Sequence, residues 1–330
     1  MLTKIKNNKV AGIAVLLIAV IIAVMLRERY LALILCFICI NSIAVTGLDI
    51  LFGYTGQVSF GHAGFYAIGA YTSTLLAKNF GMNPLFTIII GMIVAMIFGI
   101  IVAFPAAKLV KHFLSLLTIA FGQMVFMFVS VTDKLTNGYS GILNIPDVSI
   151  FGHPIKTNQA YFFFLLLITA VVLLFKRNLI NSRVGRAFIA IRENPHAANG
   201  IGINVRFYKI VAFAASAMLT GLAGALYAHL VGFISPDTFM ATQSNLFMTM
   251  LLFGGIATFL GPVIGSAILV IVTELMQSLV SYQMLMYALF ILAVLFYLPN
   301  GVVGIAKWVK ESLINKKQGK THANATERHN

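Results

Sequence analysis

The 330-residue sequence has few charged residues, and acidic residues are the scarcest of them. Asp and Glu number only 9, and charged residues make up 10% of the chain, whereas soluble domains carry about 25%. Hydrophobic residues make up 60%, and the mean hydropathy is +0.95. This composition excludes an ordinary soluble domain and predicts a protein that crosses a membrane many times.

Residues that carry chemistry are also sparse. The two cysteines, Cys36 and Cys39, lie in the apolar run LALILCFICI, where we expect small packed side chains and not a redox or metal pair. The tripeptide GKT at 319–321 lacks the upstream glycine of a phosphate-binding loop, because position 314 is Ile. With no nucleophile constellation or paired histidines either, we expect no catalysis, no metal site and no cofactor in this chain.

The net charge of +14 comes from Lys and Arg residues that lie between apolar runs and at the termini. Basic loops between spans stay on the cytoplasmic side of a membrane. This distribution explains the charge without a basic face for nucleic acid. With the N-terminal lysines inside, ten spans place both termini and the basic loop 176–209 on the cytoplasmic side.

Apolar runs long enough to cross about 30 Å of hydrocarbon predict an all-α polytopic membrane protein. We expect about ten transmembrane helices, although a count of eight or nine also fits. A single transmembrane domain over 1–306 is then followed by a polar cytoplasmic tail, 307–330. The expected spans are 10–26, 30–52, 60–77, 85–105, 113–131, 160–175, 208–232, 245–260, 262–280 and 282–298.

Residues 181–205, NSRVGRAFIAIRENPHAANGIGINV, form a polar and helix-prone segment between two apolar spans. Small residues recur along it, which favours a short helix followed by a tight turn. The segment therefore looks suited to dock on another protein under the membrane, although an ordinary basic loop remains the alternative. Pro195 disfavours a helical conformation at Asn194, so the helix is expected to end or restart there.

Residues 53–77, GYTGQVSFGHAGFYAIGAYTSTLLA, mix glycine with polar side chains between two expected spans. This pattern predicts a broken or re-entrant helix near 53–61, because exposed backbone at membrane depth must line a cavity or be buried in protein. A half-helix N-terminus there would suit a carboxylate, whereas close helix packing is the alternative. A second break, at Gly254-Gly255 and Gly261-Pro262, predicts a tight reversal between two spans.

Three further polar residues fall within the expected spans, namely Asp49, Gln123 and Glu274. An acid at the centre of a spanning helix costs roughly 2.5–3.5 kcal/mol on insertion scales, so it should face protein or water. The sequence leaves open whether these three line a pathway or form structural hydrogen bonds.

Three motifs together resemble the bacterial branched-chain amino acid ABC permeases, and most closely their LivM-type subunits. They are the 53–77 segment, the segment VGRAFIAIRENPHAANGIGINVRFYKIVAFAASAMLTGLAGALYAHLVGFISPDTF over 184–239, and the glycine break FGGIATFLGPVIGSAI. The resemblance extends roughly over 30–300. It implies a subunit of an importer in the bacterial plasma (inner) membrane, surrounded by lipid and with both termini cytoplasmic.

The same resemblance implies partners for the chain. They are a second related permease of the LivH type, two cytoplasmic ATP-binding subunits that use ATP and Mg, and an external solute-binding protein that delivers the amino acid. Transport would follow alternating access, with the 176–209 loop as the coupling helix that docks on the ATPase. The residues implied in that coupling are Gly185, Arg186, Arg192, Glu193, Asn194, Ala197, Ala198 and Gly202.

The translocation pathway is expected to be lined by polar residues and glycines of the broken helix and the spans around it. These candidates are Asp49, Gly53, Gly56, Gln57, Ser59, His62, Gln123 and Glu274. A secondary transporter driven by an ion gradient is the alternative. It would need an ion site built from intramembrane carboxylates, for which only Asp49 and Glu274 are available.

Overall fold

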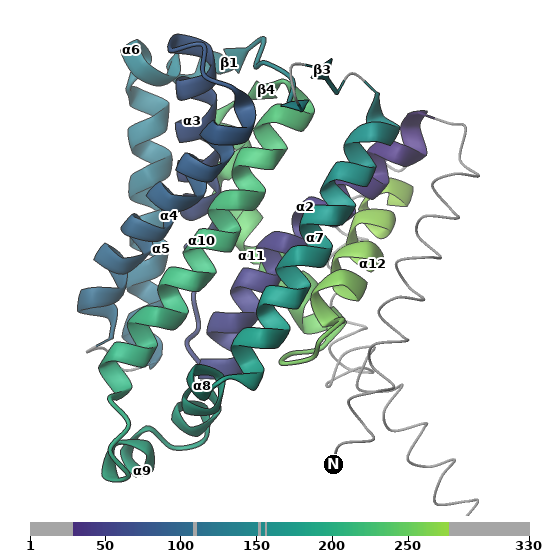
Figure 1. Ribbon diagram of the computed structural model, residues 1–330. Helices are drawn as coiled ribbons and strands as arrows, with labels where there is room; N and C mark the ends of the chain where they lie inside the picture. The colour runs from purple at the N-terminus through teal and green to yellow at the C-terminus, as the bar shows by residue number, and fades with distance from the viewer. Residues whose placement is uncertain (1–28, 108–110, 151–152, 156, 277–330) are drawn as a thin grey trace, which may run out of the picture.

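The computed structural model describes residues 29–107, 111–150, 153–155 and 157–276. Within these ranges the chain is a bundle of helices with two pairs of very short antiparallel strands (Figure 1). The helices are α2 (Arg29–Leu48), η1 (Asp49–Gly53), α3 (His62–Asn79), α4 (Pro84–Ala106), α5 (Lys111–Val131), α6 (Asp133–Thr136), η2 (Gly138–Ser140), α7 (Asn158–Asn181), α8 (Arg183–Glu193), α9 (Pro195–Gly200), α10 (Val205–Val231), η3 (Pro236–Phe239), α11 (Ala241–Gly254) and α12 (Gly261–Met276). The strands are β1 (Ile142–Leu143), β2 (Ser149–Ile150), β3 (His153–Pro154) and β4 (Phe233–Ile234).

Five of the described helices are long and apolar enough to cross a membrane, which confirms a helical membrane protein. They are Tyr30–Gly53, Pro84–Ala106, Phe113–Val131, Asn158–Asn181 and Val205–Val231. α3, α11 and α12 coincide with three more expected spans, and α12 is a shorter apolar helix. The expected spans 10–26 and 282–298 and the tail 307–330 lie outside the described residues.

The long helices run between two distinct ends of the bundle (Figure 1). α8 and α9 lie at one end, where α7 finishes and α10 begins. At the other end, β1 pairs antiparallel with β4, with Ile142 opposite Ile234 and Leu143 opposite Phe233. We refer to these as the α8 end and the β1–β4 end. The β1–β4 pair ties the loop after α5 to the end of α10.

α10 is the central helix and packs against α2, α3 and α4. Glycines allow this close approach. A Cβ on Gly69 would overlap the backbone of Gly221, and a Cβ on Gly224 would overlap the backbone carbonyl of Tyr66. Helices in membranes associate through such small-residue contacts because lipid supplies little hydrophobic driving force between them.

The predicted break near 53–61 is present. α2 passes at Asp49 into the π-helix η1, and α3 begins only at His62, after residues 56–61 that have no regular structure. Single π turns within α-helices are rare and are often found at functional sites. Gly56 has φ +69°, a conformation that glycine adopts without steric cost.

α3 and α11 begin beside each other and run to opposite ends of the bundle. The Ala63 amide donates to Ser244 Oγ at 2.8 Å, and the rings of Tyr66 and Phe247 lie 5.4 Å apart. From there α3 leads to the β1–β4 end, where Lys78 Nζ donates to the Leu143 carbonyl. α11 leads to the α8 end. The chain thus contains two antiparallel helices whose N-termini meet inside the bundle.

Candidate functional site

α8 is an amphipathic surface helix whose start and orientation are fixed locally. Ser182 caps it, with its Oγ accepting from the amides of Val184 and Gly185 at 3.1 and 3.4 Å. This is the usual role of serine at a helix N-cap. Phe188 and Ile191 are buried against the bundle. The opposite face of α8 is therefore presented outward at the end of the molecule.

The chain ends α8 and starts a second helix at the position where Pro195 predicted an interruption. Asn194 is extended, with φ −154° and ψ 105°, and its Oδ1 accepts from the amides of His196 and Ala197 at 3.0 and 3.1 Å. Asn194 is thus the N-cap of α9, and Pro195 takes the first helical position, where a missing N–H costs least. The element is two short helices joined by one extended residue.

The residues expected to dock on a partner separate into an outward and an inward group. The exposed members are Arg186, Arg192, Glu193, Asn194, Ala197 and Gly202. Gly185 and Ala198 are buried, and a Cβ on Gly185 would overlap the backbone of Ile180. These two small residues therefore serve packing within the chain. The docking role of the exposed group stays a prediction.

Two apolar side chains, Ile189 and Ile201, also project outward from this element. Their exposed fractions are 43% and 77%. The sequence did not single out these two residues, although the helical period that buries Phe188 and Ile191 places Ile189 on the outer face. Single exposed apolar side chains are common on protein surfaces, so the two isoleucines do not by themselves identify an interface.

Arg192 connects α8 directly to the broken helix. Its Nη1 donates to the carbonyl of Gly53, the last residue of η1. Gly56 lies next to the Arg192 side chain, since a Cβ there would be 3.5 Å from Arg192 Cγ. A second link joins the same segment to α10, because Gln57 Nε2 donates to the Lys209 carbonyl at 3.4 Å. The surface element and the break are thus in contact.

Asp49 and Lys176 form a buried ion pair beside the break. Lys176 Nζ lies 2.6 Å from Asp49 Oδ2, and the two side chains are 1% and 0% exposed. The other Asp49 oxygen accepts from the Ala257 amide at 2.8 Å, and Lys176 donates to the Thr258 carbonyl at 2.9 Å. Gly53 leaves room for this carboxylate, because a Cβ there would overlap it.

The burial of Lys176 corrects one boundary expected from the sequence. The basic loop was expected to start at Lys176, but α7 continues to Asn181 and places Lys176 in the core. The partner is Asp49, 127 positions earlier in the chain. Only the three-dimensional packing of α2 against α7 brings them together. Asp49 is held by this pair and by the 255–260 turn.

The other polar candidates of the broken segment are buried and hydrogen-bonded within the chain. His62 Nδ1 lies 3.1 Å from Ser59 Oγ, and His62 Nε2 lies 2.7 Å from Ser216 Oγ on α10. Gln57 Nε2 also donates to Thr55 Oγ1 at 2.9 Å. These contacts fasten the segment to α10. A role in lining a pathway stays a prediction for these residues.

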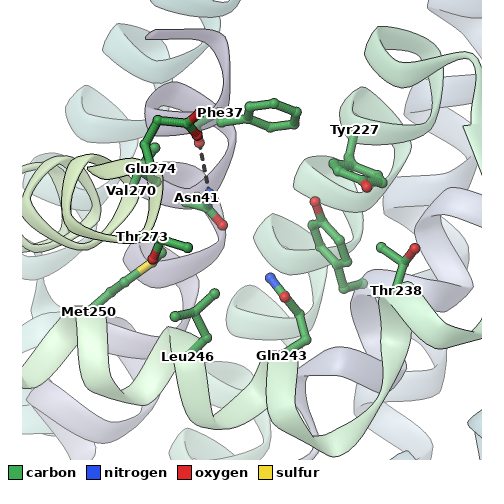
Figure 2. Close-up of a pocket in the computed structure, with 11 residues that line it drawn as sticks. Phe37, Asn41, Tyr227, Thr238, Gln243, Leu246, Met250, Val270, Thr273 and Glu274 are labelled. Carbon is green, nitrogen blue, oxygen red and sulfur yellow. Dashed lines mark hydrogen bonds between the residues drawn. The ribbon is translucent and has the colours of Figure 1, made fainter. Parts of the chain in front are cut away.

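Gln123 and Glu274 lie away from this network. Gln123 is exposed on α5, among exposed apolar side chains that include Met124 and Met127. Glu274, on α12, is half-buried and lines a cavity of about 240 Å³ (Figure 2). Within the described residues, no group of three or more His, Cys, Asp and Glu side chains could hold a metal ion.

Comparison with known proteins agrees with this architecture. The family described as the branched-chain amino acid transport system permease component matches residues 29–298. The LivM permease protein of the high-affinity branched-chain amino acid transport system of Escherichia coli is 29% identical over 284 residues, covering 79% of this chain and 67% of that protein. The probable LivM protein of Methanocaldococcus jannaschii is 26% identical over 321 residues, covering 83% of this chain and 93% of that protein.

The relatives also include a permease that is named for a different class of solute. The nucleoside ABC transporter permease protein NupC of Lactococcus lactis is 27% identical over 215 residues, covering 60% of this chain and 67% of that protein. No solved structure matches the chain. Since the family match covers most of the sequence and the described residues form a bundle of apolar helices, this chain belongs to the branched-chain amino acid ABC transporter permeases.

Proposed function

We propose that the protein is the membrane-spanning permease subunit of an ATP-driven importer for branched-chain or related amino acids. A second related permease, two cytoplasmic ATP-binding subunits and an external solute-binding protein complete the assembly. The chain itself uses no cofactor, because ATP and Mg act in the partner subunits. The α8 end faces the cytoplasm in this arrangement, and the β1–β4 end faces the binding protein.

The observation that carries this proposal is the contact between the outward-facing α8–α9 element and the broken helix. α8 is held to the bundle by Phe188 and Ile191, and Arg192 donates to the Gly53 carbonyl. A movement of α8 imposed from outside therefore reaches the backbone of η1 without an intermediate. A partner can shift a conformational equilibrium only through contacts that differ between the two states, and the exposed face of α8 and α9 is where we place those contacts.

The meeting of two helix N-termini inside the bundle gives the proposal a second support. α3 and α11 start side by side inside the bundle and point to opposite ends. In many transporters, helix ends that lie inside the bundle form the substrate site near the midplane of the membrane. We infer that ATP binding moves α8, that η1 and residues 56–61 follow, and that the two permeases then exchange inward-facing and outward-facing states.

Gln123 supports the pairing with a second permease. An amide exposed on an apolar spanning helix is unfavourable against lipid, where no hydrogen-bond partner exists. Its exposure on α5 is explained if a second permease covers this face. The surrounding methionines would then pack against that subunit.

A secondary transporter driven by an ion gradient is less consistent with the described residues. Such a mechanism needs a carboxylate that can bind and release an ion. Asp49 is already neutralised by Lys176 at 2.6 Å, which leaves Glu274 as the acid within the described apolar helices outside that pair. This pairing favours the ATP-driven class.

The test is uptake of labelled leucine into vesicles that contain the whole assembly, with and without internal ATP. We expect ATP-dependent uptake in the wild type and its loss in Arg186→Glu, with assembly preserved. Arg186→Lys is the matched control, because it keeps the positive charge of this exposed side chain and should retain most of the uptake. Uptake that continues without ATP and collapses with the ion gradient would refute the proposal.

A further inference from the structure

α4 has two unlike faces along its length. The buried face carries Gly91, Ala95 and Gly99, spaced about one helical turn apart. A Cβ on Gly91 would come within 2.7 Å of the Gly69 carbonyl oxygen, and one on Gly99 would overlap Ala217. Small residues suit contacts between helices in a membrane, because they let the backbones approach closely. The buried face of α4 therefore packs against α3 and α10.

The opposite face of α4 is an exposed stripe of large apolar side chains. It follows the helical spacing of three or four residues along the whole helix. Its members, which are 42–64% exposed, are Phe86, Ile89, Ile93, Ile97, Ile101 and Phe104. The stripe contains none of the small or polar residues that spanning helices use to contact one another, whereas the exposed face of α5 carries Gln123. The acyl chains of lipid therefore suit this face of α4 better than a second protein.

Arg206 lies at the α8 end of the stripe. It belongs to the first turn of α10, and its Cζ is 4.4 Å from the centroid of the Phe104 ring. Both side chains are exposed. Among the residues that the structure describes, no carboxylate pairs with Arg206. A guanidinium that stacks on an aromatic ring keeps the N–H donors at its edge, so Arg206 can donate to a ligand outside the chain.

A cation at the end of an apolar stripe fits a phospholipid with a negative headgroup. α4 and α10 are both long and apolar enough to span the membrane. Phe104 and Arg206 lie within one turn of the ends of these helices, which is the depth expected for lipid phosphates. A guanidinium can bind a phosphate through two parallel N–H···O hydrogen bonds. Basic sites between spanning helices on the cytoplasmic side bind anionic headgroups in this way.

We propose that Arg206 and the adjoining half of the stripe bind one anionic phospholipid in the leaflet at the α8 end. The Arg206 guanidinium donates to the lipid phosphate while it stacks on Phe104, and an acyl chain lies along Ile97 and Ile101. A zwitterionic lipid binds more weakly, because its ammonium group offsets the charge of its phosphate. Since α10 follows α9, the bound lipid fixes the depth of the helix that comes after the outward-facing element.

The test uses the complete assembly in nanodiscs with a photoactivatable phosphatidylglycerol or phosphatidylcholine that carries the reactive group at the same acyl position. We expect the phosphatidylglycerol probe to crosslink residues 97–104 about fivefold more, the preference that one basic side chain gives near an anionic headgroup. Arg206→Gln should remove this preference, and Arg206→Lys should keep part of it. Arg183→Gln, which removes an exposed arginine from α8, is the matched control and should behave as wild type.

A second measurement needs no variant at Arg206. In the wild-type assembly, the ratio of the two crosslinking yields at 97–104 should fall toward one as the salt concentration rises, because salt screens the attraction between exposed charges. Residues 163–171 of α7 are the internal reference, since Phe163, Leu167 and Val171 are exposed on an apolar spanning helix. Both probes should label that segment equally at every salt concentration.

Three results would overturn the proposal. In the first, both probes label 97–104 equally in the wild type, or their ratio does not change with salt. In the second, Arg206→Gln keeps the preference of the wild type. In the third, neither probe labels 97–104 while 163–171 is labelled, which would show that another protein covers α4. Because the readout is crosslinking and not uptake, each result leaves the importer assignment to its own test.

Discussion

Lys176 Nζ lies 2.6 Å from Asp49 Oδ2, and both side chains are buried. Each partner also holds the turn between α11 and α12, through the Ala257 amide and the Thr258 carbonyl. A single ion pair thereby joins the end of α2, the end of α7 and that turn. α8 follows directly after α7, so the pair anchors the helix from which the outward-facing element extends.

Removing one partner of this ion pair should destabilise the protein more than removing both partners. Loss of one partner leaves a buried unpaired charge and costs about 3–5 kcal/mol. We expect Asp49→Asn and Lys176→Met each to lower the thermal midpoint of the purified assembly strongly, and the double variant to recover part of the loss. Thermal unfolding monitored by size-exclusion chromatography measures this. Additive effects of the two single changes would contradict the pairing.

The contact of Arg192 with the Gly53 carbonyl should be needed for coupling and less for assembly. A hydrogen bond to a charged group contributes about 1.5–3 kcal/mol, enough to change a conformational equilibrium tenfold or more. We expect Arg192→Ala to lower the amount of leucine imported per ATP hydrolysed, and Arg192→Lys to restore part of it. Arg183→Ala, at the start of the same helix and exposed, is the control. If the amount of leucine imported per ATP hydrolysed is the same in all variants, Arg192 takes no part in coupling.

The hydrogen bonds of His62 distinguish a structural role from a role in lining the pathway. Removing the Ser216 hydroxyl leaves His62 Nε2 without its partner at 2.7 Å, and an unsatisfied buried group costs about 1–3 kcal/mol. If His62 is structural, Ser216→Ala and His62→Phe should lower the thermal midpoint and the number of active transporters, with the half-saturating leucine concentration unchanged. A changed half-saturating concentration at normal stability would instead place His62 on the pathway.

Close helix contacts predict which glycines tolerate a methyl group. A Cβ on Gly224 would overlap the Tyr66 backbone, whereas nothing lies within 4 Å of one on Gly200. Overpacking a tight contact costs about 1–3 kcal/mol. Gly224→Ala should therefore lower the thermal midpoint and the yield of folded protein, and Gly200→Ala should leave both unchanged. Similar behaviour of the two variants would contradict the close packing of α3 against α10.

The sequence predicted those features of the fold that depend on local pattern. Apolar runs located the long helices, because a helix that crosses a bilayer needs about 20 apolar residues whatever its neighbours are. The glycine-rich segments predicted the break near 53–61 and the reversal between Gly254-Gly255 and Gly261-Pro262. Pro195 predicted the interruption after α8. Each of these signals acts within a few residues of the structure that it specifies.

Long-range pairings could not be predicted in the same way. Lys176 was expected in a basic loop, because its charge and its position at the end of an apolar run fit a membrane boundary. Its burial depends on Asp49, which only the packing of α2 and α7 brings near. Ser216 and Ser244, which bind His62 and the Ala63 amide, were missed for the same reason. They are ordinary small polar residues within helices, and no local pattern distinguishes them.

Asn194 should control the shape of the outward-facing element. Its side chain accepts from two amides at the start of α9, and loss of such a cap costs about 0.5–2 kcal/mol. α9 has only six residues, too few to be stable without its cap. We expect Asn194→Ala to increase hydrogen exchange in 195–200 and to weaken binding of the ATP-binding subunits. Asn194→Asp keeps an accepting oxygen and should retain the protection of α9. If Asn194→Ala exchanges as slowly as wild type, contacts of α9 with the bundle, such as the buried Ala198, and not the cap, hold this helix in place.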